Sequence, residues 1–267
     1  GDPRTGVGVR DDGVPDIDWV SIQAGCTCLR DPRWPDVVSF PVAANRISRY
    51  PVTWRQYRAF LEAEDGYHCP VWWVPRGPDL PCDEHRVEQF RKFDNCPADN
   101  VSWFEAVAFC QWLTKRLSDE LPAGQVIRLP LEWEWQLAAQ GGDSKREYPW
   151  GRWDAGFANT SESGLDRSVA VGMYPFGVSS EYPNLLDMSG NILEWCLNLF
   201  ESSLEVRIQD IDTPRALRGG SWFGEHTTAN CLRRSQGHPD EHMKSWGFRI
   251  CCAAPVNDPP QVSRPVA

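Results

Sequence analysis

The chain has 267 residues, of which 41% are hydrophobic, and its 37 acidic against 27 basic residues give a formal net charge of −10. This acidic balance excludes the basic surplus on which binding to nucleic acid depends. No run of about 18 apolar residues occurs, so we expect no insertion into a membrane. The 14 Trp provide material for one large core, whereas 21 Gly and 22 Pro indicate many loops.

Both ends of the chain differ in composition from the middle. Residues 1–17 are rich in Gly, Asp and Pro and show no hydrophobic period, which predicts a linker or arm. We therefore expect one domain over residues 18–254 and a tail over residues 255–267. The first residues have neither the charged start nor the apolar stretch of a secretory signal. They leave the compartment unknown, with the cytoplasm favoured.

Three helices are predicted in the first half of the chain. Thr53 can cap a helix over residues 54–63, whose apolar side chains recur three and four apart. Ser102 and Glu105 form a capping box ahead of a longer run of apolar residues at helical spacing. A Pro precedes and a Gly-Gly pair follows a third helix over residues 131–140.

After residue 142 the sequence changes to short apolar pieces separated by turn residues. We expect short strands at residues 169–171, 192–195, 216–217 and 247–252. Helices early and strands late favour an α+β domain over alternating βαβ units.

Several motifs occur in order along the chain. The first three are PVTWRQYRAF from Pro51, NVSWFEAVAFCQWLTKRL from Asn100 and RLPLEWEWQLAAQGG from Arg128, and YPWG follows them. The later ones are LLDMSGNILEWCLNLF from Leu185, LRGGSW and WGFRI. Together they resemble the formylglycine-generating-enzyme or sulfatase-modifying-factor family over residues 18–253. The resemblance implies an α+β, C-type-lectin-like fold with little regular secondary structure and long loops.

Catalytic members of that family bind copper(I) through a pair of cysteines shortly after the GGS motif, and soft thiolates suit this ion. In this sequence Gly224 stands where the first thiol is expected, and Cys231 aligns outside the pair. The segment is also shorter than in the catalytic pattern. We therefore expect no copper, no catalytic residue and no enzyme activity.

The family's calcium sites map unequally onto this chain. The resemblance implies one site with carboxylates from Asp187 and Glu194 and backbone carbonyls from Gly190 and Ile192, a set of hard oxygen ligands that suits Ca²⁺. Taken without the family, the two acidic residues are better interpreted as loop carboxylates that cap nearby amides.

A second calcium site would use Asn159 and the backbone carbonyls of Thr160 and Leu165. Ser163, however, stands where the family pattern has an Asp, so this site lacks a charged ligand. Calcium is thus the one cofactor that the resemblance implies.

Cysteine and histidine residues gather in a Pro-rich stretch that contains Cys69, Cys82, His85 and Cys96. These residue types bind zinc, but their spacing matches no standard zinc motif, and unconnected thiols are the simpler interpretation. Disulfides among the ten cysteines also remain open, although a chain of this size does not need them.

A pair of glutamates and a pair of histidines could be interpreted as catalytic or metal-binding groups, but a structural interpretation is simpler for both. Glu132 and Glu134 flank Trp133 on the third helix, and residues two apart on a helix face different ways, so we expect surface and core-edge positions. His238 and His242 flank a polar turn, where solvated side chains are favoured over a metal or acid–base role. No Ser-His-Asp, P-loop or HExxH pattern occurs in the sequence.

The stretch between the GGSW and GFR motifs combines aromatic, charged and hydroxyl residues, and binding residues tend to lie on loops that a scaffold holds. The arrangement resembles the variable proteins of diversity-generating retroelements, which diversify this stretch of a lectin-like domain. The residues expected to face a ligand are Phe223, Gly224, Glu225, His226, Thr227, Asn230, Arg233, Ser235, Gln236, His238, Glu241, His242, Lys244 and Trp246.

Three interpretations of function follow. The preferred one is a non-catalytic, receptor-like binding domain whose partner is a protein or a small molecule. The alternatives are a copper-dependent formylglycine-generating oxidase and a regulatory or scaffold domain, joined in the parent chain to an N-terminal effector domain. The first is preferred because the loss of one thiolate ligand removes the copper chemistry.

Overall fold

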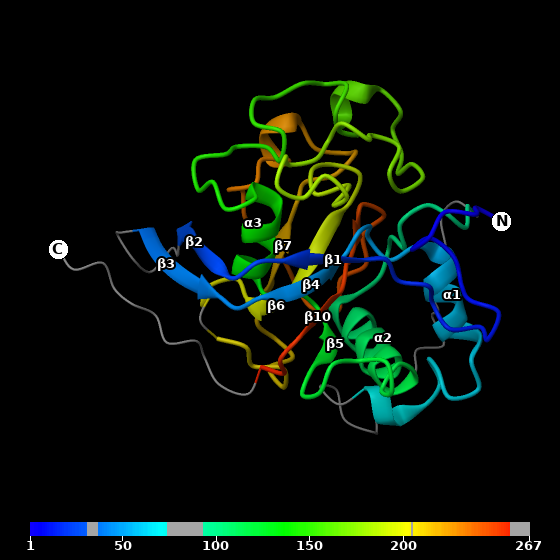
Figure 1. The fold of residues 1–267 in the computed structure, drawn as a ribbon. Helices are drawn as coiled ribbons and strands as arrows, with labels where there is room; N and C mark the ends of the chain where they lie inside the picture. Colours follow the sequence, from blue (N-terminus) through cyan, green and yellow to red (C-terminus); the bar gives the residue numbers. More distant parts are fainter. Residues whose placement is uncertain (31–36, 74–92, 204, 257–267) are drawn as a thin grey trace.

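The computed structural model describes residues 1–30, 37–73, 93–203 and 205–256 (Figure 1). Helices account for 18% of the chain and strands for 20%. Most of the backbone therefore runs in loops, as the Gly and Pro content predicts, and the α+β class is confirmed.

The strands form two four-stranded sheets and a hairpin. The first sheet has the order β1 (Trp19–Ile22), β4 (Asn45–Ser48), β10 (Cys251–Ala253) and β5 (Val126–Arg128), with antiparallel neighbours. The second has the order β8 (Ser235–Gly237), β7 (Arg215–Arg218), β6 (Leu193–Leu199) and β9 (Trp246–Gly247), with β9 parallel to β6. The hairpin consists of β2 (Gly25–Arg30) and β3 (Val37–Val42).

The three predicted helices are confirmed as α1 (Trp54–Glu62), α2 (Trp103–Arg116) and α3 (Glu132–Gln140). Ser102 caps α2 as the capping box predicts, because its hydroxyl accepts the Glu105 N–H at 3.3 Å and Glu105 accepts the Ser102 N–H at 2.7 Å. Gly141 ends α3 at a φ of 59°, a left-handed conformation that glycine adopts without strain. Short 3₁₀ helices lie at Pro70–Trp72, Ser161–Ser163 and His226–Thr228.

Aromatic rings pack the helices against one another, against the chain between β9 and β10, and against the hairpin. Phe109 on α2 meets the Phe60 ring on α1 at 5.8 Å and the Phe248 ring at 5.4 Å, both near edge-to-face. On the other side of the core, Trp133 on α3 stacks on Phe40 of the hairpin at 4.9 Å. All five side chains are buried, and burial of each contributes about 1.5–3 kcal/mol.

The prediction of helices early and strands late is wrong in detail. Four strands, β1 to β4, precede α1, and their short, irregular apolar patterns gave no signal over residues 18–48. Residues 169–171 are not a strand. Instead, the Asn191 side chain accepts the Val169 N–H at 2.9 Å and donates to the Val169 carbonyl at 3.1 Å. Side-chain hydrogen bonds therefore take the place of strand pairing at Val169.

The first 17 residues, for which the sequence predicts a linker or arm, pack on the domain as an arm. Val7 is buried, and its carbonyl accepts a hydrogen bond from the Thr53 hydroxyl at 2.7 Å. The Gln56 amide donates to the carbonyls of Gly6, at 3.0 Å, and Asp16. Side chains at the start of α1 thus donate hydrogen bonds to backbone carbonyls of the arm. Figure 1 shows the arm beside α1.

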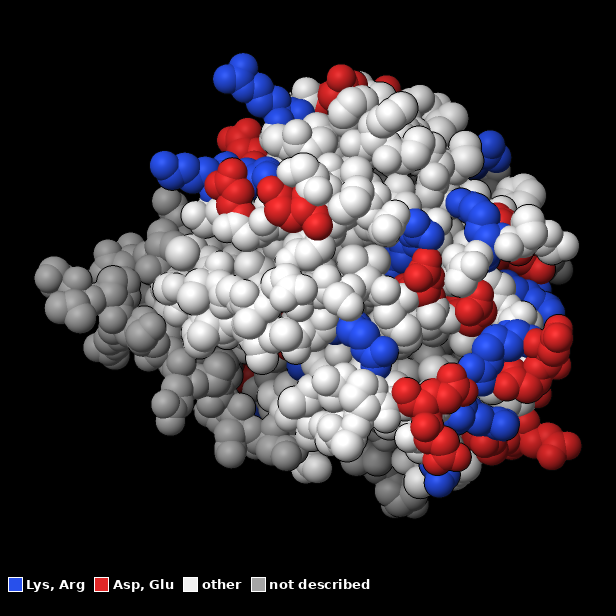
Figure 2. Space-filling model, in the orientation of Figure 1, with Lys and Arg blue, Asp and Glu red and all other residues white. Residues whose placement is uncertain are grey.

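Charged side chains of both signs intermix on the face that Figure 2 shows, and most of them gather toward the side where α1 lies. A second, smaller group of both signs lies at the upper left of this view, and the area between the two groups is largely uncharged. Within the described ranges, no helix is long and apolar enough to cross a membrane.

Candidate functional site

The segment Phe223–Trp246 follows β7 through a tight glycine turn, pairs with β7 at β8, and ends in the second sheet at β9. Gly220 has a φ of 68°, and a Cβ atom there would lie 2.6 Å from the Cα atom of Ala229. Only a glycine allows the two backbone stretches to pass this closely. The GGS motif is therefore a structural device that folds the start of the segment back on itself.

None of the fourteen predicted ligand-facing residues is buried. Eight are exposed and six are half-buried. Between them lie residues whose side chains or backbone point inward and anchor the segment, namely Ala229, Cys231, Gly237 and Pro239. This accessibility is what a binding surface needs, and the binding role itself stays a prediction.

The first part of the segment is held by the loop that follows α3. His226 stacks on Trp153 with ring centroids 4.9 Å apart, and its Nδ1 atom lies 2.6 Å from a Glu162 carboxylate oxygen. Partial burial raises the pKa of Glu162, but hydrogen bonds from the backbone N–H and the ring of His226 outweigh it and lower this pKa to about 2. His226 therefore has a fixed orientation although it is half-exposed.

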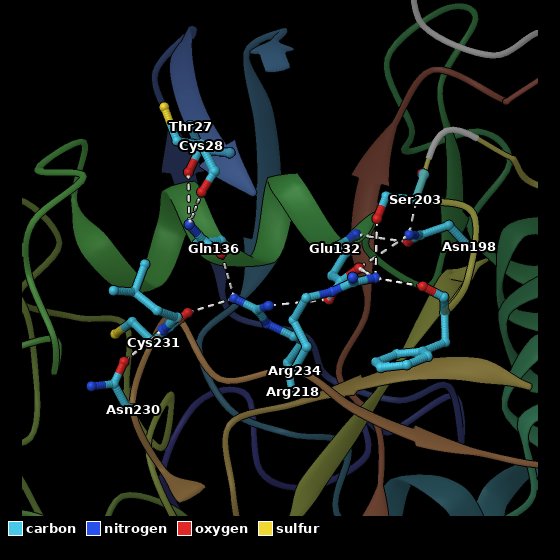
Figure 3. Close-up of polar contacts among 12 residues, drawn as sticks. Thr27, Cys28, Glu132, Gln136, Asn198, Ser203, Arg218, Asn230, Cys231 and Arg234 are labelled. Carbon is cyan, nitrogen blue, oxygen red and sulfur yellow. Dashed lines mark hydrogen bonds and ion pairs between the residues drawn. The ribbon is translucent and has the colours of Figure 1, made fainter. Parts of the chain in front are cut away.

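The middle of the segment is attached to α3 by two arginines that share one carboxylate (Figure 3). Glu132 accepts from Arg218 at 3.1 Å and from Arg234 at 2.6 and 2.8 Å. Arg218 also donates to the Gln136 side chain at 2.6 Å and to the Cys231 carbonyl. The guanidinium groups thereby fix both the backbone at Cys231 and the side chain three residues later.

This buried network corrects the expectation for Glu132 and Glu134. Glu132 is fully buried rather than exposed, and Glu134 makes a two-pronged ion pair with Arg128, with both N···O distances 2.7 Å. Sequence reasoning missed the network at Glu132 because Arg218 and Arg234 lie 86 and 102 residues away along the chain, whereas Arg128 is only six residues from its partner Glu134. The available signal was Arg218 in the LRGGSW motif and the pair of arginines at positions 233 and 234.

The last part of the segment lies against the start of α2. The Trp103 N–H donates to the Pro239 carbonyl at 3.0 Å, and His242 Nε2 lies 2.9 Å from Glu105. His238 pairs with Asp240, and this hydrogen bond raises the pKa of the imidazole. The two histidines are therefore paired with carboxylates, not simply solvated as predicted.

Gly224, at the position of the first copper thiol, has no side chain that could bind a metal. A Cβ atom there would contact the Thr228 hydroxyl, which would have to rotate away. Cys231 is fully buried, and burial raises the pKa of its thiol to about 12, so it is protonated at neutral pH. Because copper(I) requires thiolates, the residues present do not fit this ion.

The first predicted calcium site does not assemble. Glu194 is fully buried, and its carboxylate accepts from Arg249 at 2.6 and 2.8 Å and from Trp135 Nε1 at 2.6 Å. Asp187 instead accepts the Gly172 N–H at 2.6 Å, in agreement with the capping interpretation. Gly190 lies nearby, donating its N–H to the Gly219 carbonyl at 2.8 Å. An arginine thus already neutralises the principal carboxylate, and the set with Ile192 does not fit Ca²⁺.

At the second predicted calcium site, the side chain of Asn159 is engaged in hydrogen bonds within the protein. Its side-chain oxygen accepts from the Ser163 hydroxyl at 2.8 Å, and its amide donates to the Arg167 carbonyl at 2.9 Å. Thr160 is buried, whereas Leu165 is exposed. No group of three or more His, Cys, Asp or Glu side chains gathers as a metal site within the described ranges. Calcium at this second position stays a prediction.

The remaining cysteines give no sign of a cross-link. Nine of the ten cysteines fall within the described residues, and all nine are free. Of the predicted zinc set, Cys69 is half-buried and Cys96 is buried, and burial raises the pKa of the Cys96 thiol to about 11. Cys82 and His85 lie outside the described residues, so the zinc prediction stays untested.

An irregular α+β domain with two small sheets, and a long segment carried between strands of one of them, defines the class of C-type-lectin-like folds. Residues 15–254 match the model of the "Sulfatase-modifying factor enzyme 1-like domain". The chain belongs to this family.

Similar proteins include both active and inactive members. The formylglycine-generating enzyme of Mus musculus is 29% identical over 210 residues, which cover 68% of this chain and 51% of that protein. The chain therefore spans about half the length of this relative. The enzyme of Thermomonospora curvata is 27% identical over 275 residues, covering 79% of this chain and 82% of that protein. An inactive C-alpha-formylglycine-generating enzyme 2 of Bos taurus is 29% identical over 212 residues, covering 71% and 61%.

A solved structure supports the fold independently of the sequence. Treponema denticola variable protein 1 superimposes with a TM-score of 0.63 at 19% identity, covering 89% of this chain and 95% of that one. Family membership and fold are thus established, and neither decides between catalysis and binding.

Proposed function

We propose that this domain is a non-catalytic binding domain that presents the exposed residues of the segment Phe223–Trp246 to a ligand, as the variable proteins of diversity-generating retroelements do. The observation that carries the proposal is that this segment contains both anchored residues and accessible ones. Cys231 and Arg234 are tied to a buried arginine frame, which consists of the ion pairs that Arg128, Arg218 and Arg249 make with Glu134, Glu132 and Glu194, while the predicted ligand-facing side chains stay accessible. A rigid scaffold under variable side chains limits the ordering cost of binding.

The absence of a fitting copper site supports binding over oxidation. Gly224 and the protonated Cys231 supply no thiolate. We expect no aldehyde when the protein is incubated with copper(I), oxygen and a cysteine-containing peptide, with a formylglycine-generating enzyme as the positive control. Aldehyde formation above the protein-free blank would overturn the proposal and favour the oxidase that the enzyme relatives suggest.

The binding surface is tested with a ligand selected from a displayed peptide library against the full chain. The variant Arg233→Ala/Gln236→Ala removes two exposed side chains from the middle of the segment. The control Lys115→Ala/Gln23→Ala removes the same kinds of exposed side chain, with the same charge change, elsewhere on the domain.

We expect the segment variant to weaken peptide binding by about tenfold or more, because central contact residues each contribute about 1 kcal/mol or more. The control variant should bind like the parent chain. Equal affinity of both variants for every selected peptide would show that the segment is not the binding surface.

A further inference from the structure

The loop over residues 153–163 lies against the start of the segment Phe223–Trp246, and the proposed function does not use it. The Ser161 N–H donates to the Gly224 carbonyl at 2.9 Å, which joins the two stretches through their backbones. Figure 1 shows the short helix of the loop, in green, and the start of the segment, in orange, together at the top of the view. The segment therefore begins on a support that lies outside it.

His226 is held by this support through both its ring and its backbone. The imidazole stacks on Trp153 with ring centroids 4.9 Å apart and planes 25° from parallel. Glu162 accepts the His226 backbone N–H at 2.9 Å, and the same carboxylate oxygen lies 2.6 Å from the ring Nδ1 atom. The Tyr148 hydroxyl donates to the His226 carbonyl at 3.1 Å. These contacts fix a side chain that remains 37% exposed.

The contact with Glu162 determines which ring nitrogen of His226 carries the proton. Although partial burial raises the pKa of Glu162, its hydrogen bonds lower that pKa to about 2, so the carboxylate is ionised at neutral pH. An ionised carboxylate only accepts hydrogen bonds, and the Nδ1 atom must therefore donate. In the neutral imidazole the Nε2 atom is then the acceptor.

The Nε2 atom of His226 is open to a ligand. Within the described residues it forms no hydrogen bond, and it is not one of the buried polar atoms that lack a partner, so it contacts solvent. The two other histidines of the segment differ. The Nε2 atom of His242 lies 2.9 Å from Glu105, and His238 pairs with Asp240 of its own exposed turn. His226 thus combines a support from outside the segment with an open acceptor.

We propose that Glu162, outside the segment, is a positioning residue of the binding surface, and that it holds His226 so that Nε2 accepts a hydrogen bond from the ligand. The inference rests on the proposed function and specifies the chemistry of one contact. The ligand presents a hydrogen-bond donor at this point, such as a hydroxyl group or an amide or ammonium N–H. A side chain that is oriented before binding loses less freedom on binding, which raises affinity by about threefold to tenfold.

Peptides from a displayed library, selected on the full chain and counter-selected on His226→Phe, test the proposal. This variant keeps a ring against Trp153 and removes both nitrogens, so the surviving peptides depend on the nitrogens of His226. We expect such peptides to be obtained and to bind His226→Phe about tenfold more weakly than the parent chain. If none survives, this inference fails, and the proposed function still stands where other selected peptides lose binding in Arg233→Ala/Gln236→Ala.

A double-mutant cycle separates positioning from general support of the fold. Glu162→Ala should weaken these peptides by about threefold to tenfold in the parent chain and leave the residual binding of His226→Phe unchanged, because it acts through the imidazole. The matched control Glu147→Ala removes an exposed carboxylate beside Tyr148 and should have no effect. Equal weakening in both backgrounds, or none in the parent chain, would overturn the proposal.

The ligand side of the contact is tested in the same peptides. Each donor is removed in turn, side chains by alanine substitution and backbone N–H groups by methylation. One of these changes should weaken binding to the parent chain by about tenfold and leave binding to His226→Phe unchanged. If no change has this pattern, His226 does not accept a hydrogen bond from the ligand.

Long-range proton–nitrogen NMR spectra of the histidine rings provide a readout without any ligand. At about pH 8, where an imidazole is ordinarily neutral, the parent chain should show His226 with its proton on Nδ1. Glu162→Ala should lose this signature, and Glu147→Ala should keep it. A proton on Nε2 in the parent chain would contradict the role assigned to Glu162.

Discussion

The buried arginine frame and the exposed segment Phe223–Trp246 use the same residue types in opposite ways. Arg218 and Arg249 are fully buried, and each is paired with a glutamate from another element. Arg233 is exposed, with no ion pair in the described ranges. The charged groups of the frame are thus paired with one another and fix elements that are distant in the sequence. The charged side chain of Arg233 in the segment remains available to a ligand.

The difference has a physical reason. A buried ion pair contributes little net stability, because desolvation offsets most of the attraction, but it requires one geometry. The three buried glutamates of these ion pairs, Glu132, Glu134 and Glu194, lie on or beside α3 and fix β5, β6 and β7 relative to this helix. A domain whose strands are short can in this way present a long segment on a defined base.

The largest expected effect comes from breaking the frame at Glu132. Glu132→Gln leaves Arg218 and Arg234 buried together without their shared carboxylate. We expect a loss of about 3–5 kcal/mol in the free energy of unfolding, because an uncompensated charge remains inside. Urea unfolding measures it, with the exposed Glu64→Gln as the control. A loss below about 1 kcal/mol would mean that the frame is not structurally required.

A second test concerns Asp99, a buried carboxylate with no ion pair among the described residues. Burial raises the pKa of Asp99 to about 6, although Trp54 Nε1 and the Ser168 hydroxyl donate to it at 3.1 and 3.2 Å. Because the folded pKa lies above the unfolded value near 3.8, the folded state binds a proton more readily. This contribution is fully present below pH 4 and is lost as the pH rises through 6.

Asp99→Asn should therefore stabilise the domain at pH 7 by about 2–3 kcal/mol and flatten the dependence of stability on pH between 4 and 7. The pH series of unfolding midpoints measures this, and the exposed Asp119→Asn should keep the slope of the parent chain. Burial also raises the pKa of Asp187 to about 6, so part of the slope should remain. An unchanged slope in Asp99→Asn would contradict the assignment.

A smaller effect is expected where the N-terminal arm meets α1. Gln56→Ala removes the donor to the Gly6 and Asp16 carbonyls and should cost about 1–3 kcal/mol, since these buried acceptors lose their partner. Hydrogen exchange should rise over residues 1–17 and stay unchanged in α3. The exposed Gln23→Ala serves as the control. If exchange in the arm is equally fast in the parent chain, the arm is not held as the structure shows.

Short-range sequence patterns predicted the helices. The buried ion pairs of Glu132 and Glu194 were not predicted, because their partners are far apart in the sequence. The capping box of Ser102 and Glu105 lies within one turn, so the sequence alone specifies the start of α2. The roles of Glu132 and Glu194 depend on arginines 86 and 55 residues away, which no spacing rule connects. The accessible positions of the segment were predictable because its bracketing motifs are recognisable, whereas its anchor at Arg234 was not.

The smallest expected effect concerns stability in the exposed segment itself. Arg233→Ala/Gln236→Ala should change the free energy of unfolding by no more than about 0.5 kcal/mol, because neither side chain is buried. Arg234→Ala, one residue from Arg233, should cost about 2 kcal/mol or more, since it removes the ion pair with Glu132 and the hydrogen bond to the Phe200 carbonyl at 2.7 Å. Urea unfolding of the two variants compares them directly. Similar losses in both would show that the segment has no division between anchors and free positions, and the structural basis for a changeable binding surface would fail.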